Sequence, residues 1–231
     1  MLIETMYPHE ITAEIFNDWS IVTNSLERLH NEYNKQRRKN KVPKDKTYSV
    51  AYDIKTKKKN TWIFILSKAP SIQSYKGLES VNACCLVYYY NSEGIRVFKV
   101  RPEGGLSVYN GHLFTRYNER MSLDLDKSID IVKHFFINNG YSTSQILPKE
   151  GRDFFMSTCK DGLLLGELQE ERSWMVNKTF INRDQLKPSQ DELEVELIKS
   201  LQVQIETELN KPEFNKMIHD YKTDVIKGIL S

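Results

Sequence analysis

The sequence lacks the features that mark secreted and membrane-spanning proteins. It contains only three cysteines in 231 residues, Cys84, Cys85 and Cys159. An odd number, with two of them adjacent, implies no disulfide framework, and reduced thiols are typical of the cytosol. No apolar run approaches the roughly 18 residues that a bilayer-spanning helix needs, and residues 1–6 lack the basic and apolar regions of a signal peptide. The sequence therefore predicts a soluble, cytoplasmic protein that does not bind a membrane.

The familiar catalytic motifs are also missing. There is no phosphate-binding loop of the form G-x-x-x-x-G-K-[ST], no G-x-G-x-x-G, no H-E-x-x-H and no pair of C-x-x-C motifs. The G-x-S-x-G motif of serine hydrolases is absent as well. These absences exclude the commonest nucleotide-binding, zinc-dependent and serine-dependent enzyme classes, and we expect neither a cofactor nor a structural metal.

The composition describes a globular protein with a well-charged surface. Hydrophobic residues make up 39% and charged residues 28% of the chain, and the mean hydropathy is −0.54. The net charge of +2 identifies no partner, but basic residues gather in the first third of the chain and acidic residues in the 190s and 200s. The length allows one core with a helical appendage, so we predict an α+β domain over 1–186 and a helical hairpin over 187–231, packed on the same domain.

Hydrophobic periodicity predicts the elements of the first domain. A long helix is expected over 10–41, because apolar residues recur there at three- and four-residue steps. Helices are also expected over 112–121 and 124–138, and 141–151 is expected to be a polar connection. The predicted strands are 47–54, 61–66, 81–90, 95–100 and 106–109, followed by an antiparallel meander over 153–181. Together these elements predict an α+β fold with antiparallel sheets of about six to eight strands flanked by helices.

The last predicted element is the C-terminal hairpin. Leucines and an isoleucine recur at four-residue steps on one face of its first helix, at Leu193, Leu197, Leu201, Ile205 and Leu209. An apolar face of this kind needs a cover. Either the protein's own sheet provides it, or the 188–231 helices bind another protein or a second copy of the chain in a homodimer.

One helix carries a chemically capable face. At about 100° per residue, His112, Arg116, Glu119 and Arg120 fall within one arc of the predicted helix 112–121. A histidine transfers protons near neutral pH, and arginines bind phosphate oxygens with two N–H groups at once. Lys178 and Thr179, near the end of the last predicted strand, supply a further donor pair if that strand faces the helix. The alternative is an ion-paired surface, in which Glu119 binds Arg116.

The order of these residues resembles that of barnase/RelE-type ribonuclease toxin domains. The pattern His-x-x-x-Arg-x-x-Glu-Arg stands on a helix, a second helix follows, and a strand meander ends in Lys178-Thr179-Phe180-Ile181. The resemblance covers residues 110–182 only, and the strands over 47–101 exceed what such domains need. It implies cleavage of RNA without a metal, with His112 as acid and base and with Arg116 and Arg120 as phosphate clamps.

A basic region supports a different hypothesis. It runs from 35 to 59 and contains Lys35, Arg37, Arg38, Lys39, Lys57, Lys58 and Lys59. Cations at a helix C-terminus are favoured by the helix dipole and lysines at a turn improve solubility, so this region is either an ordinary solvated surface or a contact for nucleic acid. Three functions therefore stay open: a ribonuclease or toxin-like effector, a non-catalytic nucleic-acid-binding protein, and a protein-interaction or scaffolding protein.

Overall fold

The computed structural model describes residues 1–43, 46–68, 81–101, 105–140, 142–149, 152–169 and 173–186. The chain divides into two units, Met1–Gln185 and Leu186–Ser231, and the fold described below is that of the first unit. The hairpin predicted over 187–231, with the partner contacts expected of residues 188–231, lies outside the described residues.

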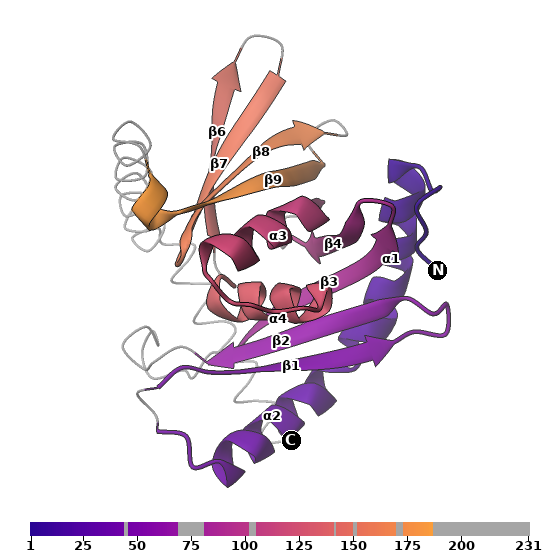
Figure 1. Ribbon diagram of the computed structural model, residues 1–231. Coiled ribbons are helices and arrows are strands. Elements are labelled where there is room, and N and C mark those ends of the chain that lie inside the picture. Colours follow the sequence, from indigo (N-terminus) through magenta and orange to yellow (C-terminus); the bar gives the residue numbers. More distant parts are fainter. Residues whose placement is uncertain are drawn as a thin grey trace, which may run out of the picture. The chain divides into compact units, whose positions relative to one another are not determined.

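The described part of the first unit contains four helices and one sheet of nine strands (Figure 1). The helices are α1 (Pro8–Thr23), α2 (Leu26–Lys39), α3 (Gly111–Arg120) and α4 (Ser128–Asn138). The strands are β1 (Tyr48–Lys55), β2 (Thr61–Lys68), β3 (Val81–Asn91), β4 (Gly94–Val100), β5 (Leu106–Tyr109), β6 (Ser142–Lys149), β7 (Arg152–Cys159), β8 (Gly162–Gln169) and β9 (Trp174–Asn182). A short 3-10 helix, η3 (Arg183–Gln185), follows β9.

The strand order in the sheet is β1-β2-β3-β4-β5-β9-β8-β7-β6. The two groups of strands predicted from the sequence are therefore joined into one sheet, and the joint is a parallel pair in which β5 runs beside β9 with Leu106 opposite Trp174. The prediction of six to eight antiparallel strands is wrong, because the sheet has nine strands and is mixed; the α+β class fits. Parallel neighbours need a long crossover connection, here α3, α4 and β6 to β8, and no local sequence signal reveals such a pairing.

Strand β6 accounts for the underestimated strand number. The segment Ser142–Lys149, expected to be a polar connection, pairs along its length with β7. It lies at the edge of the sheet, where a strand has no neighbour on one side and can carry polar residues and a proline such as Pro148. The alternation of apolar and polar residues that marks a strand with a buried face therefore does not identify this strand.

The predicted single helix over 10–41 is also wrong, because two helices stand in its place. Helix α1 ends at Thr23 and α2 begins at Leu26, with Asn24 and Ser25 between them. Asparagine and serine compete with helical backbone hydrogen bonds through their own side chains. The apolar spacing continues across the break, since Val22 and Leu29 are both buried in the same core, so periodicity alone could not locate it.

Helices cover both faces of the sheet and bury a core on each. Helices α1 and α2 pack on one face against side chains that include Trp62, Phe64 and Trp174. Helices α3 and α4 pack on the other face, against Ile63 and Ile65 among others. Strand β2 is therefore buried on both sides, which explains its continuous apolar sequence. The structure of this unit is a sheet between two helical layers.

Cys84 and Cys85 show the same division between the two faces. They are neighbours on β3, and side chains of successive strand residues point to opposite faces, so Cys84 lies in the core under α3 and α4 and Cys85 in the core under α1 and α2. Cys159 is also buried, and all three thiols are free.

Candidate functional site

The candidate site lies where α3 meets β9. Helix α3 begins at Gly111, where a Cβ atom would lie 2.9 Å from the carbonyl oxygen of Glu93, so that only glycine allows this approach to the turn before β4. Its buried side chains are Leu113, Phe114 and Tyr117. The ring of Tyr117 meets that of Phe180 on β9 edge to face, with centroids 5.1 Å apart. This packing turns the polar arc of α3 toward β9.

Two of the predicted site residues come together across this interface. Arg116 Nη1 donates a hydrogen bond of 2.6 Å to Thr179 Oγ1 on β9, and both side chains are partly buried. Glu119 is exposed, and among the residues that the structure describes no ion pair joins it to Arg116. The guanidinium of Arg116 is therefore held by a neutral hydroxyl rather than by a carboxylate.

Arg120 is held in the same way, one turn further along α3. Strand β5 ends at Tyr109, opposite Asn177, so the rest of β9 has a strand neighbour only on the side of β8. Arg120 covers part of the open side, because its Nη1 donates to the carbonyl oxygen of Phe180. Asn182 in turn donates from its side-chain amide to the carbonyl oxygen of Arg120, at 3.2 Å.

His112 stands one turn before Arg116 on the same face of α3, and its side chain is exposed. Residues four apart on a helix are neighbours on its surface, so His112 and Arg116 border the same solvent-facing region. The arrangement offers one imidazole and two guanidiniums, and in the described part of the chain no ion pair joins any of these three side chains to a carboxylate.

Lys178 does not join this group. Its ammonium forms an ion pair of 2.7 Å with Glu167 Oε1 on β8. The register between β8 and β9 shifts between Leu165 and Gly166, so that Thr179 and Asn177 pair with consecutive residues and Lys178 is the extra residue of a bulge. The predicted donor pair is therefore separated, with Thr179 at α3 and Lys178 at Glu167. Gly166 lies at this shift, and a Cβ there would collide with the Val176 carbonyl and the Phe155 ring.

A polar cluster that the sequence did not indicate lies behind this site. The Tyr117 hydroxyl donates a hydrogen bond of 2.8 Å to Asp161 Oδ2, in the turn between β7 and β8. Asn139 donates to the same oxygen at 2.7 Å and accepts a hydrogen bond of 2.9 Å from the Asp161 backbone N–H through Oδ1. His134 Nδ1 on α4 lies 3.2 Å from the Tyr117 hydroxyl. Burial, and secondarily Asp161, raises the pKa of Tyr117.

This cluster fixes the rotation of α3 about its own axis, and with it the direction of Arg116 and Arg120. The sequence alone does not indicate that Tyr117 contacts Asp161. The four partners come from α3, α4, the end of α4 and a distant turn, so no spacing along the chain brings them together.

The seven predicted nucleic-acid-binding residues form two groups rather than one surface. Four lie on the last turns of α2 and three at the tip of the hairpin between β1 and β2. The end of α2 meets the start of β1, since Asn40 donates to the Tyr48 hydroxyl at 3.0 Å, whereas the tip follows the other end of this eight-residue strand. A strand of that length spans about 25 Å, and the two groups stand at its opposite ends (Figure 1). The members are Lys35, Arg37, Arg38 and Lys39, and then Lys57, Lys58 and Lys59.

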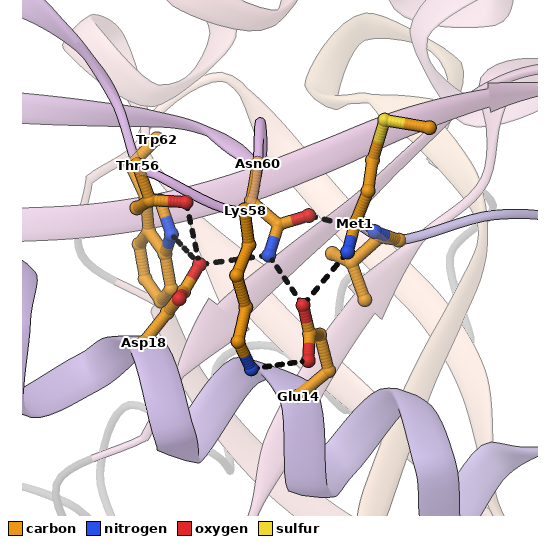
Figure 2. A network of polar contacts seen from close by, with 8 residues as sticks. Met1, Glu14, Asp18, Thr56, Lys58, Asn60 and Trp62 are labelled. Carbon is orange, nitrogen blue, oxygen red and sulfur yellow. Dashed lines mark hydrogen bonds and ion pairs between the residues drawn. The ribbon is translucent and has the colours of Figure 1, made fainter.

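The hairpin tip is tied to α1 by a network of polar contacts (Figure 2). Lys58 Nζ lies 2.8 Å from Glu14 Oε2, and the hydrogen bond to Lys58 is the main cause that lowers the pKa of Glu14 to about 2. Asp18 is buried and accepts hydrogen bonds from Asn60 at 2.7 Å and Thr56 at 3.0 Å. At least one of the three lysines at the tip therefore has a structural partner.

Neither a metal centre nor a membrane span is evident in the described part of the chain. No group of three or more histidine, cysteine, aspartate or glutamate side chains there is arranged to hold a metal ion. No described helix is both long enough and apolar enough to cross a bilayer. Comparison with protein-family models, with curated proteins and with solved structures finds no match to this chain.

Proposed function

We propose that this protein cleaves RNA at the surface formed by α3 and β9, without a metal ion. One observation carries the proposal: Arg116 and Arg120 are both held in place by neutral oxygens, the Thr179 hydroxyl and the Phe180 carbonyl. A guanidinium has five N–H donors, so each arginine keeps donors and a full positive charge for a phosphate.

The chemistry requires a proton acceptor and a means of stabilising negative charge. His112 accepts the proton of a ribose 2′-hydroxyl, whose oxygen forms a bond to phosphorus as the bond from phosphorus to the 5′-oxygen breaks. The departing 5′-oxygen takes up a proton from water, and the products are a 2′,3′-cyclic phosphate and a 5′-hydroxyl. Arg116 and Arg120 stabilise the charge that builds on the phosphorane oxygens, and fixed donors of this kind need no rearrangement as the charge develops.

The order of elements agrees with the resemblance to barnase/RelE-type ribonuclease domains. Two helices, α3 and α4, precede the antiparallel strands β6 to β9. Strands β1 to β5 and helices α1 and α2 are additional elements that such domains do not need. The non-catalytic alternative, a nucleic-acid contact through the basic region 35–59, has less support, since its cations stand at both ends of β1.

The test is incubation of the full chain with labelled single-stranded RNA in EDTA. We expect cleavage that leaves 2′,3′-cyclic phosphate ends and that does not occur on 2′-O-methyl RNA. His112→Ala should reduce the rate by about 10²- to 10⁴-fold, the usual contribution of a general base. His30→Ala is the matched control, because His30 is an exposed histidine on α2. Equal rates in the two variants, or no cleavage by the wild-type protein, would refute the proposal.

A further inference from the structure

We propose that Tyr90 on β3, supported by Tyr88, is a stacking platform for a base of the bound RNA, beside the point where His112 begins α3. The inference deepens the proposed function and rests on it. It adds a contact to the bases of the substrate, because Arg116 and Arg120 are proposed to bind only phosphate.

A row of residues across the end of the sheet brings Tyr90 close to the start of α3. Tyr90 pairs with Ile95 on β4. Gly111, which follows β5, lies on the other side of Ile95, since a Cβ at Gly111 would be 3.2 Å from the backbone nitrogen of Ile95. Neighbouring strands are about 4.8 Å apart, so the backbones of Tyr90 and Gly111 are separated by about 10 Å. His112 is the next residue after Gly111 and is exposed.

Tyr90 belongs to the face of the sheet that α3 and α4 cover. Its partner Ile95 is buried in the core under these helices, together with Leu113 of α3. Side chains of residues that pair directly across two antiparallel strands lie on the same face. Tyr89 lies in the core on the opposite face, under α1 and α2, as the alternation along a strand requires. Tyr90 and α3 are therefore on one face, at one end of the sheet.

The fold presents the Tyr90 ring to solvent and also supports it. Tyr90 is 57% exposed. The ring of Tyr88 meets it edge to face, with centroids 5.8 Å apart and an interplanar angle of 89°. Tyr88 is itself half-buried and packs against the core under α3 and α4. A ring that is held in place before binding loses little conformational freedom when it binds a ligand.

The surroundings of Tyr90 suit a base better than a phosphate. Exposed charges of both signs border it: Lys55 on β1 lies in the row of Thr61 and Tyr88, and Glu93 lies in the turn after β3. These opposite charges do not concentrate positive charge for a phosphate. Every base has a flat face that stacks on an aromatic ring, and aromatic side chains on a sheet are a common platform for single-stranded RNA. We therefore expect a contact with little preference for sequence.

Binding can be measured by anisotropy on the full chain with two fluorescent probes that carry no 2′-hydroxyl. One is a 2′-O-methyl RNA of about six nucleotides, and the other has the same sugars and phosphates without bases. Tyr90→Leu should weaken binding of the first probe about 5-fold or more, the effect of one lost base stack, and should leave binding of the second unchanged. Tyr90→Phe keeps the ring and should bind both probes as the wild-type protein does. Tyr7→Leu is the matched control, because Tyr7 is exposed and precedes α1, a helix of the opposite face.

A salt series separates stacking from the attraction of charges. Stacking releases no counterions, so Tyr90→Leu should lower log K equally at every salt concentration and leave the slope of log K against log salt unchanged. The platform is overturned if Tyr90→Leu weakens both probes equally or neither, or if Tyr90→Phe or Tyr7→Leu weakens the RNA as much. It is also overturned if the wild-type protein binds the two probes equally or binds neither.

Cleavage separates this inference from the function beneath it. A substrate with a single ribose among deoxynucleotides fixes the phosphate that is cleaved, and two further substrates each lack the base on one side of it. If the wild-type protein cleaves, Tyr90→Leu should lower kcat/KM several-fold on the complete substrate but not on one of the two incomplete substrates. An equal loss on all three would overturn the placement of the base beside His112. If the wild-type protein cleaves none of them, the proposed function fails, and the binding series alone decides whether Tyr90 stacks on a base.

Discussion

The hydroxyl of Tyr117 donates its hydrogen to the carboxylate of Asp161, 2.8 Å away, and so joins α3 to the turn between β7 and β8. Because this phenol is buried beside a carboxylate, its pKa is raised in the folded protein. A group whose pKa is higher when folded stabilises the protein fully below its ordinary value of about 10 and loses that contribution as the pH rises above it.

We therefore expect the protein to lose stability above about pH 10, and tyrosinate absorbance of Tyr117 to appear only with unfolding. Tyr117→Phe should cost about 1–2 kcal/mol at neutral pH, since a hydrogen bond to a charged group is lost, and should lose less stability at alkaline pH than the wild-type protein. Tyr90→Phe is the control, because Tyr90 is exposed. Denaturant unfolding over a pH series measures both, and identical alkaline profiles for wild-type and Tyr117→Phe would contradict the assignment.

The ion pair between Glu14 and Lys58 predicts a response to acid. The pKa of the Glu14 carboxyl is lowered to about 2 in the folded protein. The ion pair therefore stabilises the protein above the ordinary pKa of 4.5, and this stabilisation is lost as the pH falls from 4.5 toward 2. Lys58 is half exposed, and solvent screening keeps the expected contribution small. Lys58→Gln should flatten the acid limb of the stability curve, whereas Lys57→Gln, at the neighbouring exposed position, should leave it unchanged.

Two aspartates of unequal burial should respond unequally to the same substitution. Asp18 is 1% exposed and accepts hydrogen bonds from Thr56 and Asn60, so Asp18→Ala leaves buried donors without an acceptor and should cost about 2–4 kcal/mol. Asp53 forms its ion pair with Lys133 at the surface, so Asp53→Ala should cost less than about 1 kcal/mol. Urea unfolding compares them, and equal losses would mean that the network in Figure 2 does not stabilise the hairpin tip.

The three cysteines should be unreactive in the folded protein. Burial raises the pKa of Cys85 to about 12 and that of Cys159 to about 11, and also raises that of Cys84. Since the thiolate is the reactive form, a disulfide reagent should modify them slowly at neutral pH and should modify all three at once in denaturant. Rapid modification of a single thiol in the native protein would show that one of the two cores opens.

Thr179 should matter for catalysis through Arg116. Thr179→Val removes the hydroxyl that accepts from Arg116, and we expect RNA cleavage to fall about 10-fold or more, the effect of roughly 1.4 kcal/mol in the transition state. Thr179→Ser keeps the hydroxyl and should restore most of the rate. The loss should appear in kcat rather than KM if Arg116 acts mainly on the transition state. Equal rates for the valine and serine variants would show that the hydroxyl does not position Arg116.

Local patterns in the sequence identified most of the elements but not their assembly. The strands from β1 to β5 and the meander of β7 to β9 have clear alternation or clear turn residues, and the sequence located each of them to within a few residues. Strand β6 was not predicted, because an edge strand need not be apolar. The break between α1 and α2 was not predicted, because the apolar spacing continues through it. The pairing of β5 with β9 depends on contacts between distant residues, which no window of the sequence contains.

The candidate site shows the same limit. Periodicity placed His112, Arg116 and Arg120 on one face of a helix, and the structure brings Arg116 to Thr179. The sequence could not separate Lys178 from Thr179, because the bulge opposite Gly166 that turns Lys178 to Glu167 depends on pairing with β8. It also could not reveal the partners of Tyr117, which come from three other parts of the chain.

The parallel pairing of β5 with β9 has a consequence for how the chain folds. Strand β5 finds its second neighbour only when residues 174–177 are available, after both helices of the α3 and α4 layer and three further strands have been made. Contacts between such distant residues slow folding, and domains form largely as units during synthesis. The surface of α3 and β9 that carries the proposed activity is therefore assembled late, so an unfinished chain still attached to the ribosome has not yet built it.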